Sequence, residues 1–146
     1  MRSPLKRRKG NHRKSLASGG GSPLEADQQE ILVAQIADTL ARHGRRLLAI
    51  PNERRLYGTT AQRVAQWRAL ERRGVSPGAP DMLIPGAPPD LPHCPGVAIE
   101  LKRDRAAAWR PGQREWLLHF AALGWLAFRA DGLDHALAML ARAGYR

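Results

Sequence analysis

The sequence has one cysteine, Cys94, no acidic residue before Glu25, and no apolar run long enough to cross a bilayer. A single thiol excludes an intramolecular disulfide framework and any zinc or iron–sulfur site built from several cysteines. A membrane-spanning helix needs about 20 consecutive apolar residues, so we exclude an integral membrane protein. The scarcity of cysteine suits a reducing, intracellular compartment, and we predict a cytoplasmic protein.

Several motifs of common enzyme classes are also missing. The sequence contains no GxGxxG, no Walker A sequence, no paired CxxC and no GxSxG. Dinucleotide binding, P-loop phosphate chemistry and serine hydrolysis therefore have no support. The 146 residues match the size of one domain, which holds roughly 100–200 residues. Such a chain can bury one core but has no room for a second catalytic lobe.

Basic residues outnumber acidic ones by 24 to 13, which gives a formal net charge of +11. Residues 1–24 contain seven Lys and Arg and end in a Ser/Gly-rich stretch. They have too few apolar residues to offset the entropy lost on folding, so we predict a disordered basic tail over 1–24 and a folded domain over 25–146. Such a tail attracts polyanions by counterion release, although a merely solvated tail is an equally simple explanation.

From Glu25 onward, the spacing of apolar residues predicts alternating helices and strands. Helices are expected over 25–43, 59–73, 113–123 and 131–143, with Pro111 in the first turn of the third helix and Asp131 capping the fourth. Strands are expected over 47–50, 82–84, 97–102 and 125–128, and the first of them should be buried. The late strand–helix–strand crossover favours an α/β fold with helices on the faces of a sheet.

Charged residues stand at the ends of two of these strands. Asp81 directly precedes one strand, and Glu100-Leu101-Lys102 ends the next. Strand side chains alternate, so Glu100 and Lys102 share a face while Leu101 points to the opposite, apolar side. If the two strands are neighbours, Asp81 joins Glu100 at one end of the sheet. Two carboxylates there would be hard oxygen ligands for Mg²⁺ or Mn²⁺, and a lysine amine can orient or help deprotonate an attacking water.

Lys102 is also unusual in composition. From Glu25 to the C-terminus the sequence has 16 Arg and this single Lys. Arginine keeps its proton at ordinary pH, whereas neighbouring groups can tune the pKa of a lysine, so we expect that the amine itself is needed. An ExK triplet alone occurs by chance on ordinary solvated edge strands. Its combination with Pro80-Asp81 in a basic domain favours a site.

Five short segments occur in an order that is typical of one nuclease family: Glu25-Ala26-Asp27-Gln28-Gln29, Ile50-Pro51-Asn52-Glu53, Gly74 to Asp81, Glu100-Leu101-Lys102, and Gln113 with Trp116. Together they resemble the VRR-NUC domain of the PD-(D/E)xK nuclease superfamily, in the standalone form found in phages and prophages. The resemblance covers nearly all of residues 25–146. It implies a restriction-endonuclease-like fold, a mixed sheet flanked by helices, in a protein that a bacterium or a phage encodes.

The resemblance also implies roles for the residues of the predicted site. Asp81 and Glu100 would hold a catalytic Mg²⁺ or Mn²⁺ with the help of the Leu101 carbonyl, and Lys102 would position the hydrolytic water. Gln113 would face the site.

A first-helix acid would complete the cluster. Glu25 and Glu30 are the two candidates, and they face different ways on the helix. We choose Glu25 because its spacing to Gln29 and to the following apolar run matches the family better.

Several residues are candidates for contact with DNA. Asn52, Arg54 and Arg55 follow the first strand at the expected active end, so we assign them to substrate binding, with a turn role for Asn52 as the alternative. Arginines around the second helix could follow phosphates or simply be solvated: Arg54, Arg55, Arg63, Arg68, Arg72 and Arg73. All four tryptophans could stack on bases, but apolar positions place Trp116 and Trp125 in the core, and Trp109 has the better claim to the surface.

The predicted function is a metal-dependent, structure-specific DNA endonuclease. By analogy with standalone members of the family, its substrate would be branched DNA such as a four-way junction, and it would act as a homodimer because two related cuts need two sites. Two alternatives stay open: a nuclease of the same fold acting on flap or duplex DNA, and a non-catalytic basic protein that binds nucleic acid.

Overall fold

The computed structural model describes residues 25–51 and 56–146. The predicted basic tail over 1–24 and the predicted substrate-binding residues Asn52, Arg54 and Arg55 lie outside the described residues. In the described ranges, none of the helices combines the length and apolar character needed to span a membrane.

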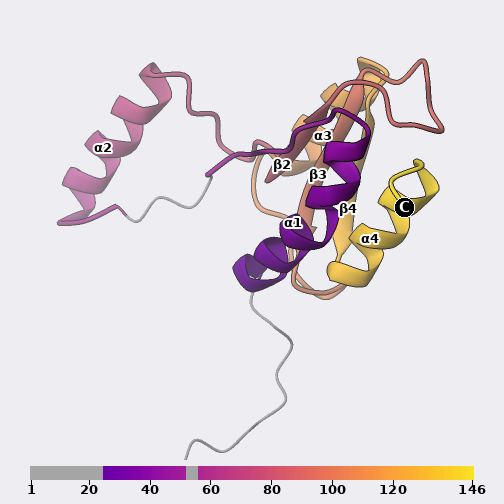
Figure 1. Ribbon diagram of the computed structural model, residues 1–146. Coiled ribbons are helices and arrows are strands. Elements are labelled where there is room, and N and C mark those ends of the chain that lie inside the picture. Colours follow the sequence, from indigo (N-terminus) through magenta and orange to yellow (C-terminus); the bar gives the residue numbers. More distant parts are fainter. Residues whose placement is uncertain (1–24, 52–55) are drawn as a thin grey trace, which may run out of the picture.

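Eight elements follow one another in the order that the sequence predicts (Figure 1). They are α1 (Glu25–Arg42), β1 (Leu48–Ala49), α2 (Thr60–Arg72), β2 (Met82–Pro85), β3 (Gly96–Lys102), α3 (Gln113–Ala122), β4 (Leu126–Asp131) and α4 (Leu133–Arg142). Every predicted helix and strand is confirmed in type and order.

The four strands form one mixed sheet in the order β1-β2-β3-β4. β1 pairs with β2 and β2 with β3 in the antiparallel sense, whereas β3 and β4 are parallel. A parallel pair needs a crossover connection, and α3 supplies it. The predicted strand–helix–strand crossover is therefore confirmed, and the fold is α/β.

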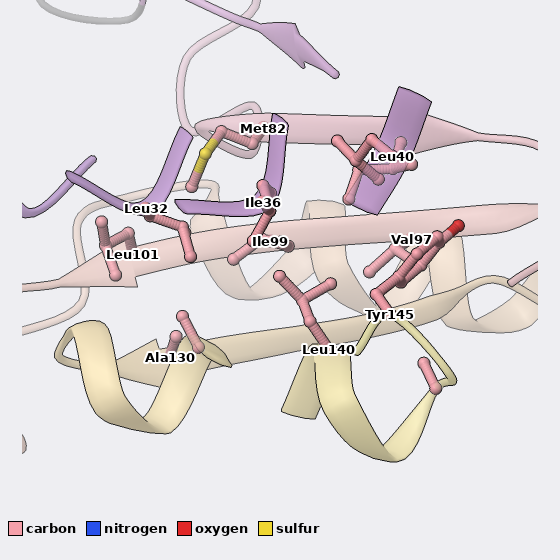
Figure 2. Close-up of a cluster of buried hydrophobic side chains, with 13 residues drawn as sticks. Leu32, Ile36, Leu40, Met82, Val97, Ile99, Leu101, Ala130, Leu140 and Tyr145 are labelled. Carbon is pink, nitrogen blue, oxygen red and sulfur yellow. The ribbon is translucent and has the colours of Figure 1, made fainter. Parts of the chain in front are cut away.

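The hydrophobic core lies between β3 and the two helices α1 and α4. Buried residues of α1 recur every four positions, at Leu32, Ile36 and Leu40, so they form one stripe along the helix. Figure 2 shows this stripe facing Ile99 and Leu101 of β3, with side chains of α4 closing the cluster. α3 contacts β3 and β4 but neither α1 nor α4. It therefore covers the other face of the sheet.

The prediction of a buried first strand is wrong. β1 is only two residues long and lies at the edge of the sheet, and Leu48 is 55% exposed. An apolar dipeptide at an edge has only one strand neighbour, so its apolar character did not imply burial.

Two predictions about helix starts are also wrong. Asp131 does not cap α4, because it is the last residue of β4, paired with Lys102, and Gly132 with a φ of 99° makes the turn into the helix. Pro111 lies before α3 rather than in its first turn, because Gly112 with a φ of 84° precedes the first helical residue, Gln113. In both places a glycine with positive φ sets the boundary, since a residue with a Cβ adopts that conformation at a cost.

α2 stands apart from the rest of the fold. No residue of α2 is buried, and no other described helix or strand packs against it. Figure 1 shows the helix to one side of the sheet, connected to β2 through residues 73–81. Its start is stabilised locally by a capping box, in which Thr59 and Gln62 satisfy each other's backbone N–H groups.

Candidate active site

Three carboxylates from three different elements meet at the open end of the sheet. One oxygen each from Glu25 in α1, Asp81 before β2 and Glu100 in β3 lie within 4.8 Å of one another. Glu30 instead lines a separate shallow cleft beside α1, with Ala26 and Val33. Of the two first-helix acids, the structure thus brings Glu25 into the cluster.

The strand register explains how Asp81 reaches Glu100. Met82 pairs with Ile99, so the preceding residue, Asp81, lies opposite Glu100. The backbone N–H of Leu101 donates a hydrogen bond of 2.8 Å to Asp81 Oδ2 and fixes the carboxylate. In an extended strand the N–H and C=O of one residue point to the same side. The Leu101 carbonyl therefore faces the Asp81 side of β3, where the resemblance to the VRR-NUC domain implied a metal ligand.

Glu100 and Lys102 form a buried ion pair on the face of β3 opposite to the core. Each residue is 1% exposed, and Lys102 Nζ lies 2.8 Å from Glu100 Oε1. Lys102 Nζ also lies 3.6 Å from Glu25 Oε1, so the amine is shared between two acids of the cluster. The side-chain amide of Gln113 donates a further hydrogen bond to Glu100 Oε1.

Burial raises the pKa of Glu100 from its ordinary value of 4.5 to about 7. Desolvation is the largest cause, and the negative charge of Asp81 adds to it, while the hydrogen bond and charge of Lys102 act in the opposite direction. The second oxygen of the carboxylate, Oε2, is buried and has no hydrogen-bond partner among the described residues. A buried acceptor in this state costs free energy unless a ligand satisfies it.

The residues present fit a small divalent cation. Three carboxylates and a backbone carbonyl are all hard oxygen donors, which Mg²⁺ and Mn²⁺ prefer to nitrogen or sulfur. A cation would also satisfy Glu100 Oε2 and offset the mutual repulsion of Glu25, Asp81 and Glu100. Lys102 supplies one positive charge to this group, which is too little to balance three ionised carboxylates.

Gln113 reaches the cluster because the start of α3 is locked onto the loop before β2. Its Oε1 accepts a hydrogen bond of 2.8 Å from the backbone N–H of Arg110, so its amide nitrogen is left facing Glu100. Gly78, with a φ of 74°, packs so closely on this turn that a Cβ there would lie 2.6 Å from the Pro111 carbonyl oxygen. A hydrogen bond of 3.1 Å from Trp116 Nε1 to Ser76 Oγ joins the same two segments.

Gln28 is a site residue whose role the sequence did not reveal. It is 5% exposed, and its amide nitrogen donates a hydrogen bond of 3.0 Å to the carbonyl of Arg103, directly after β3. This bond ties the start of α1, and with it Glu25, to the end of the strand that carries Lys102. The spacing of the helix could have predicted that Gln28 is buried, because it lies four residues before Leu32, as Leu32 lies four residues before Ile36.

Arg129 organises the loop that leaves the site after β3. One of its terminal nitrogens donates to the carbonyls of Asp104, Arg105 and Ala107, at 3.3, 3.2 and 2.8 Å. Its guanidinium lies 5.0 Å from the ring centroid of Trp109, which is 40% exposed. The predicted surface position of Trp109 is confirmed, and its partner is an arginine of the protein. Trp116 and Trp125, expected in the core, are only half-buried, and both pack against Phe120.

Two clefts open on either side of Asp81. The larger, of about 390 Å³, is lined by Glu25, Gln29 and the segment 49–51 at the end of β1. The smaller, of about 250 Å³, lies between Trp67 of α2, the loop 75–78 and the segment 110–113. The carboxylate cluster is thus accessible from two directions.

Comparison with solved structures shows the same architecture in a VRR_NUC domain protein. The two chains superpose with a TM-score of 0.56 over 84% of this chain and 89% of the other, at 21% sequence identity. The fold is restriction-endonuclease-like. No family model matches the sequence, and neither does any curated protein. The predicted fold class is therefore confirmed by structure rather than by sequence similarity.

Proposed function

We propose that the protein is a metal-dependent endonuclease that hydrolyses phosphodiester bonds in DNA. The observation that carries the proposal is the buried Glu100–Lys102 pair, with Glu25 and Asp81 beside it. A protein gains little stability from burying such a pair, because desolvation of the two charges offsets their attraction. A group of acids around a lysine, at an end of the sheet where two clefts open, suits the hydrolysis of a phosphate ester.

Glu25, Asp81, Glu100 and the Leu101 carbonyl would hold Mg²⁺ or Mn²⁺. When bound, such an ion polarises a phosphoryl oxygen and stabilises the negative charge that develops during attack. Gln113 holds Glu100 through Oε1 and so leaves Oε2 for the ion.

Lys102 would orient the attacking water. Its amine is held by Glu100 at 2.8 Å and by Glu25 at 3.6 Å, so its position is fixed before substrate arrives. An ammonium group has three N–H donors, and two carboxylate contacts leave one N–H to donate a hydrogen bond to a water. Arginine could not place a single donor in the same way, because its guanidinium is broad and planar.

The proposed substrate is branched DNA, such as a four-way junction, cut by a homodimer. Symmetric cuts on two strands need two sites related by a two-fold axis, and the described part of one chain contains one carboxylate cluster. Asn52, Arg54 and Arg55 would contact the DNA backbone. The enzyme would be of the standalone phage or prophage type and would act in the cytoplasm.

The test is a cleavage assay with labelled four-way junction, flap and linear duplex DNA, in Mg²⁺, Mn²⁺ or EDTA. We expect metal-dependent cutting that falls by about 10²–10⁴-fold in Lys102→Ala and is lost in Asp81→Ala. Glu25→Ala should be impaired, whereas Glu30→Ala, the matched change five residues along the same helix, should cut normally. If the wild type binds all three DNAs without cutting, and Asp81→Ala binds equally well, the protein is a basic binding module instead.

A further inference from the structure

The 250 Å³ cleft connects α2 to the carboxylate cluster. Trp67 forms its wall on the side of α2, and Asp81 and Gln113 belong to its opposite wall. Asp81 is one of the three clustered acids, and Gln113 donates to Glu100. A group lodged against Trp67 would therefore lie next to the proposed site of hydrolysis.

Trp67 is the large aromatic residue of a helix that has no packing role in the core. α2 contains no buried residue, and Trp67 itself is only half-buried. The indole lines the cleft although no helix or strand of the described chain packs on α2. A half-buried indole that lines a cleft next to the proposed site of hydrolysis is suited to base stacking, which tolerates any sequence because every base has a π-face.

The charges around Trp67 favour a polyanion. Arg63 lies one turn before Trp67 on the same face of α2, and Arg110 lines the cleft from the opposite side. The helix has Glu71 as its only acid, against Arg63, Arg68 and Arg72. Basic side chains that follow the backbone beside an aromatic platform are the usual arrangement for binding single-stranded nucleic acid.

The cleft has room for one base. Its volume is about 250 Å³, slightly below the roughly 300 Å³ at which pockets for drug-sized ligands begin, so one planar ring system fits in it. A base in a duplex has both faces covered by its neighbours and cannot stack on a side chain without leaving the helix. A base that stacks on Trp67 must therefore be unpaired or easily unpaired.

We propose that Trp67 stacks on a nucleobase beside the scissile phosphate and so directs the enzyme to branched DNA in which a nucleotide at the cut is unpaired or easily unpaired. This inference rests on the proposed nuclease function and names a specificity residue for it. α2 is then one wall of the DNA-binding cleft, and Arg63 binds the backbone next to the stacked base.

The test uses the full chain with flap DNA that carries 2-aminopurine in the unpaired position next to the branch, in Ca²⁺ to allow binding without cutting. Stacking on Trp67 should quench the fluorescence of the probe. Trp67→Ala should lose this quenching and bind the flap about 5- to 150-fold more weakly, while its affinity for linear duplex stays unchanged. Trp67→Phe should keep most of both effects, and Leu118→Ala, which shortens an exposed apolar residue of α3 outside the cleft, should behave as wild type.

Unchanged quenching and affinity in Trp67→Ala would overturn the inference, as would an equal loss of affinity for flap and duplex. A lower molar mass of Trp67→Ala than of the wild type in light scattering would instead assign α2 to contact with a second copy of the chain. Cleavage in Mg²⁺ is measured in parallel. If cutting depends on Lys102 but not on Trp67, the stacking role alone is refuted. If no DNA is cut but quenching still depends on Trp67, the nuclease function is refuted and the cleft remains a binding site for a base.

Discussion

All seven residues of β3 are buried, yet the strand has two chemically opposite faces. Val97, Ile99 and Leu101 face α1 and α4 and form the centre of the hydrophobic core. Glu100 and Lys102, equally buried, face the other way toward Gln113. Burial of the first set stabilises the fold in proportion to the apolar area removed from water. Burial of the second set costs desolvation free energy that the ion pair barely recovers, so its value must lie in chemistry rather than in stability.

The sharpest way to test this contrast is to remove both charges while keeping the shapes, with Glu100→Gln and Lys102→Met combined. Cleavage should fall by at least about 10²–10⁴-fold. Stability should stay equal or rise, by up to about 1–4 kcal/mol, because well-packed neutral groups replace a buried ion pair. Urea denaturation and the junction-cleavage assay on the same preparation measure both effects.

The single variant Lys102→Met provides the control for that experiment. It leaves Glu100 without its positive partner, so it should be less stable than the double variant at pH 8. A double variant that loses stability by several kcal/mol would mean that the charged face of β3 serves the fold, and the functional interpretation of its burial would be wrong.

On the apolar face the opposite result is expected. Ile99→Ala removes a fully buried side chain from the core and should destabilise the protein by about 2–5 kcal/mol. Measured well below its melting temperature, the variant should still cleave DNA at close to the wild-type rate, because the side chain points away from Glu100. A large loss of activity at retained stability would show that the two faces are not independent.

The spacing of apolar residues and the positions of glycine and proline were enough to predict all eight elements of the fold. The alternation along Glu100-Leu101-Lys102 correctly separated the two faces of β3, and the apolar spacing of α1 was read correctly. The failures have a common physical origin. The burial of Leu48 and the capping role of Asp131 were predicted from residue type alone. In the structure, the edge position of β1 exposes Leu48, and Gly132 takes the position before α4 while Asp131 ends β4.

The candidate site was predictable only in part for the same reason. The acids and the lysine stand at strand ends, where topology brings them together, so Asp81, Glu100 and Lys102 could be grouped from order alone. The locking of the loop before β2 onto the start of α3 could not be predicted, because it depends on the close approach of Gly78 to a turn more than 30 residues away. The separation of α2 from the core was equally invisible in its sequence.

The close contact of Gly78 with the turn before α3 leads to a prediction for which Gly74 is the control. Gly74 and Gly78 both have positive φ, at 86° and 74°, but a Cβ on Gly74 meets no atom within 4 Å. Gly74→Ala should cost only the conformational penalty of about 1–2 kcal/mol. Gly78→Ala should cost more and should reduce cleavage further, because it pushes Asp81 and Gln113 apart. Equal effects of the two substitutions in thermal denaturation and cleavage would show that the close contact between Gly78 and the turn before α3 does not hold the site together.

The smallest expected effect is a pH dependence of stability in the metal-free protein. The pKa of Glu100 is raised from 4.5 to about 7, so the folded state binds a proton more tightly than the unfolded state does. That contribution to stability is fully present below pH 4.5 and is lost as the pH rises through 7, an amount on the order of 2 kcal/mol between pH 5 and 8. In EDTA, the free energy of unfolding of wild type relative to Glu100→Gln should therefore fall over this range. Mg²⁺ should restore the difference at pH 8 far more than at pH 5, because the cation binds the ionised carboxylate. A difference that is independent of pH would mean that Glu100 is already ionised at pH 5, and that Lys102 outweighs desolvation on this face of β3.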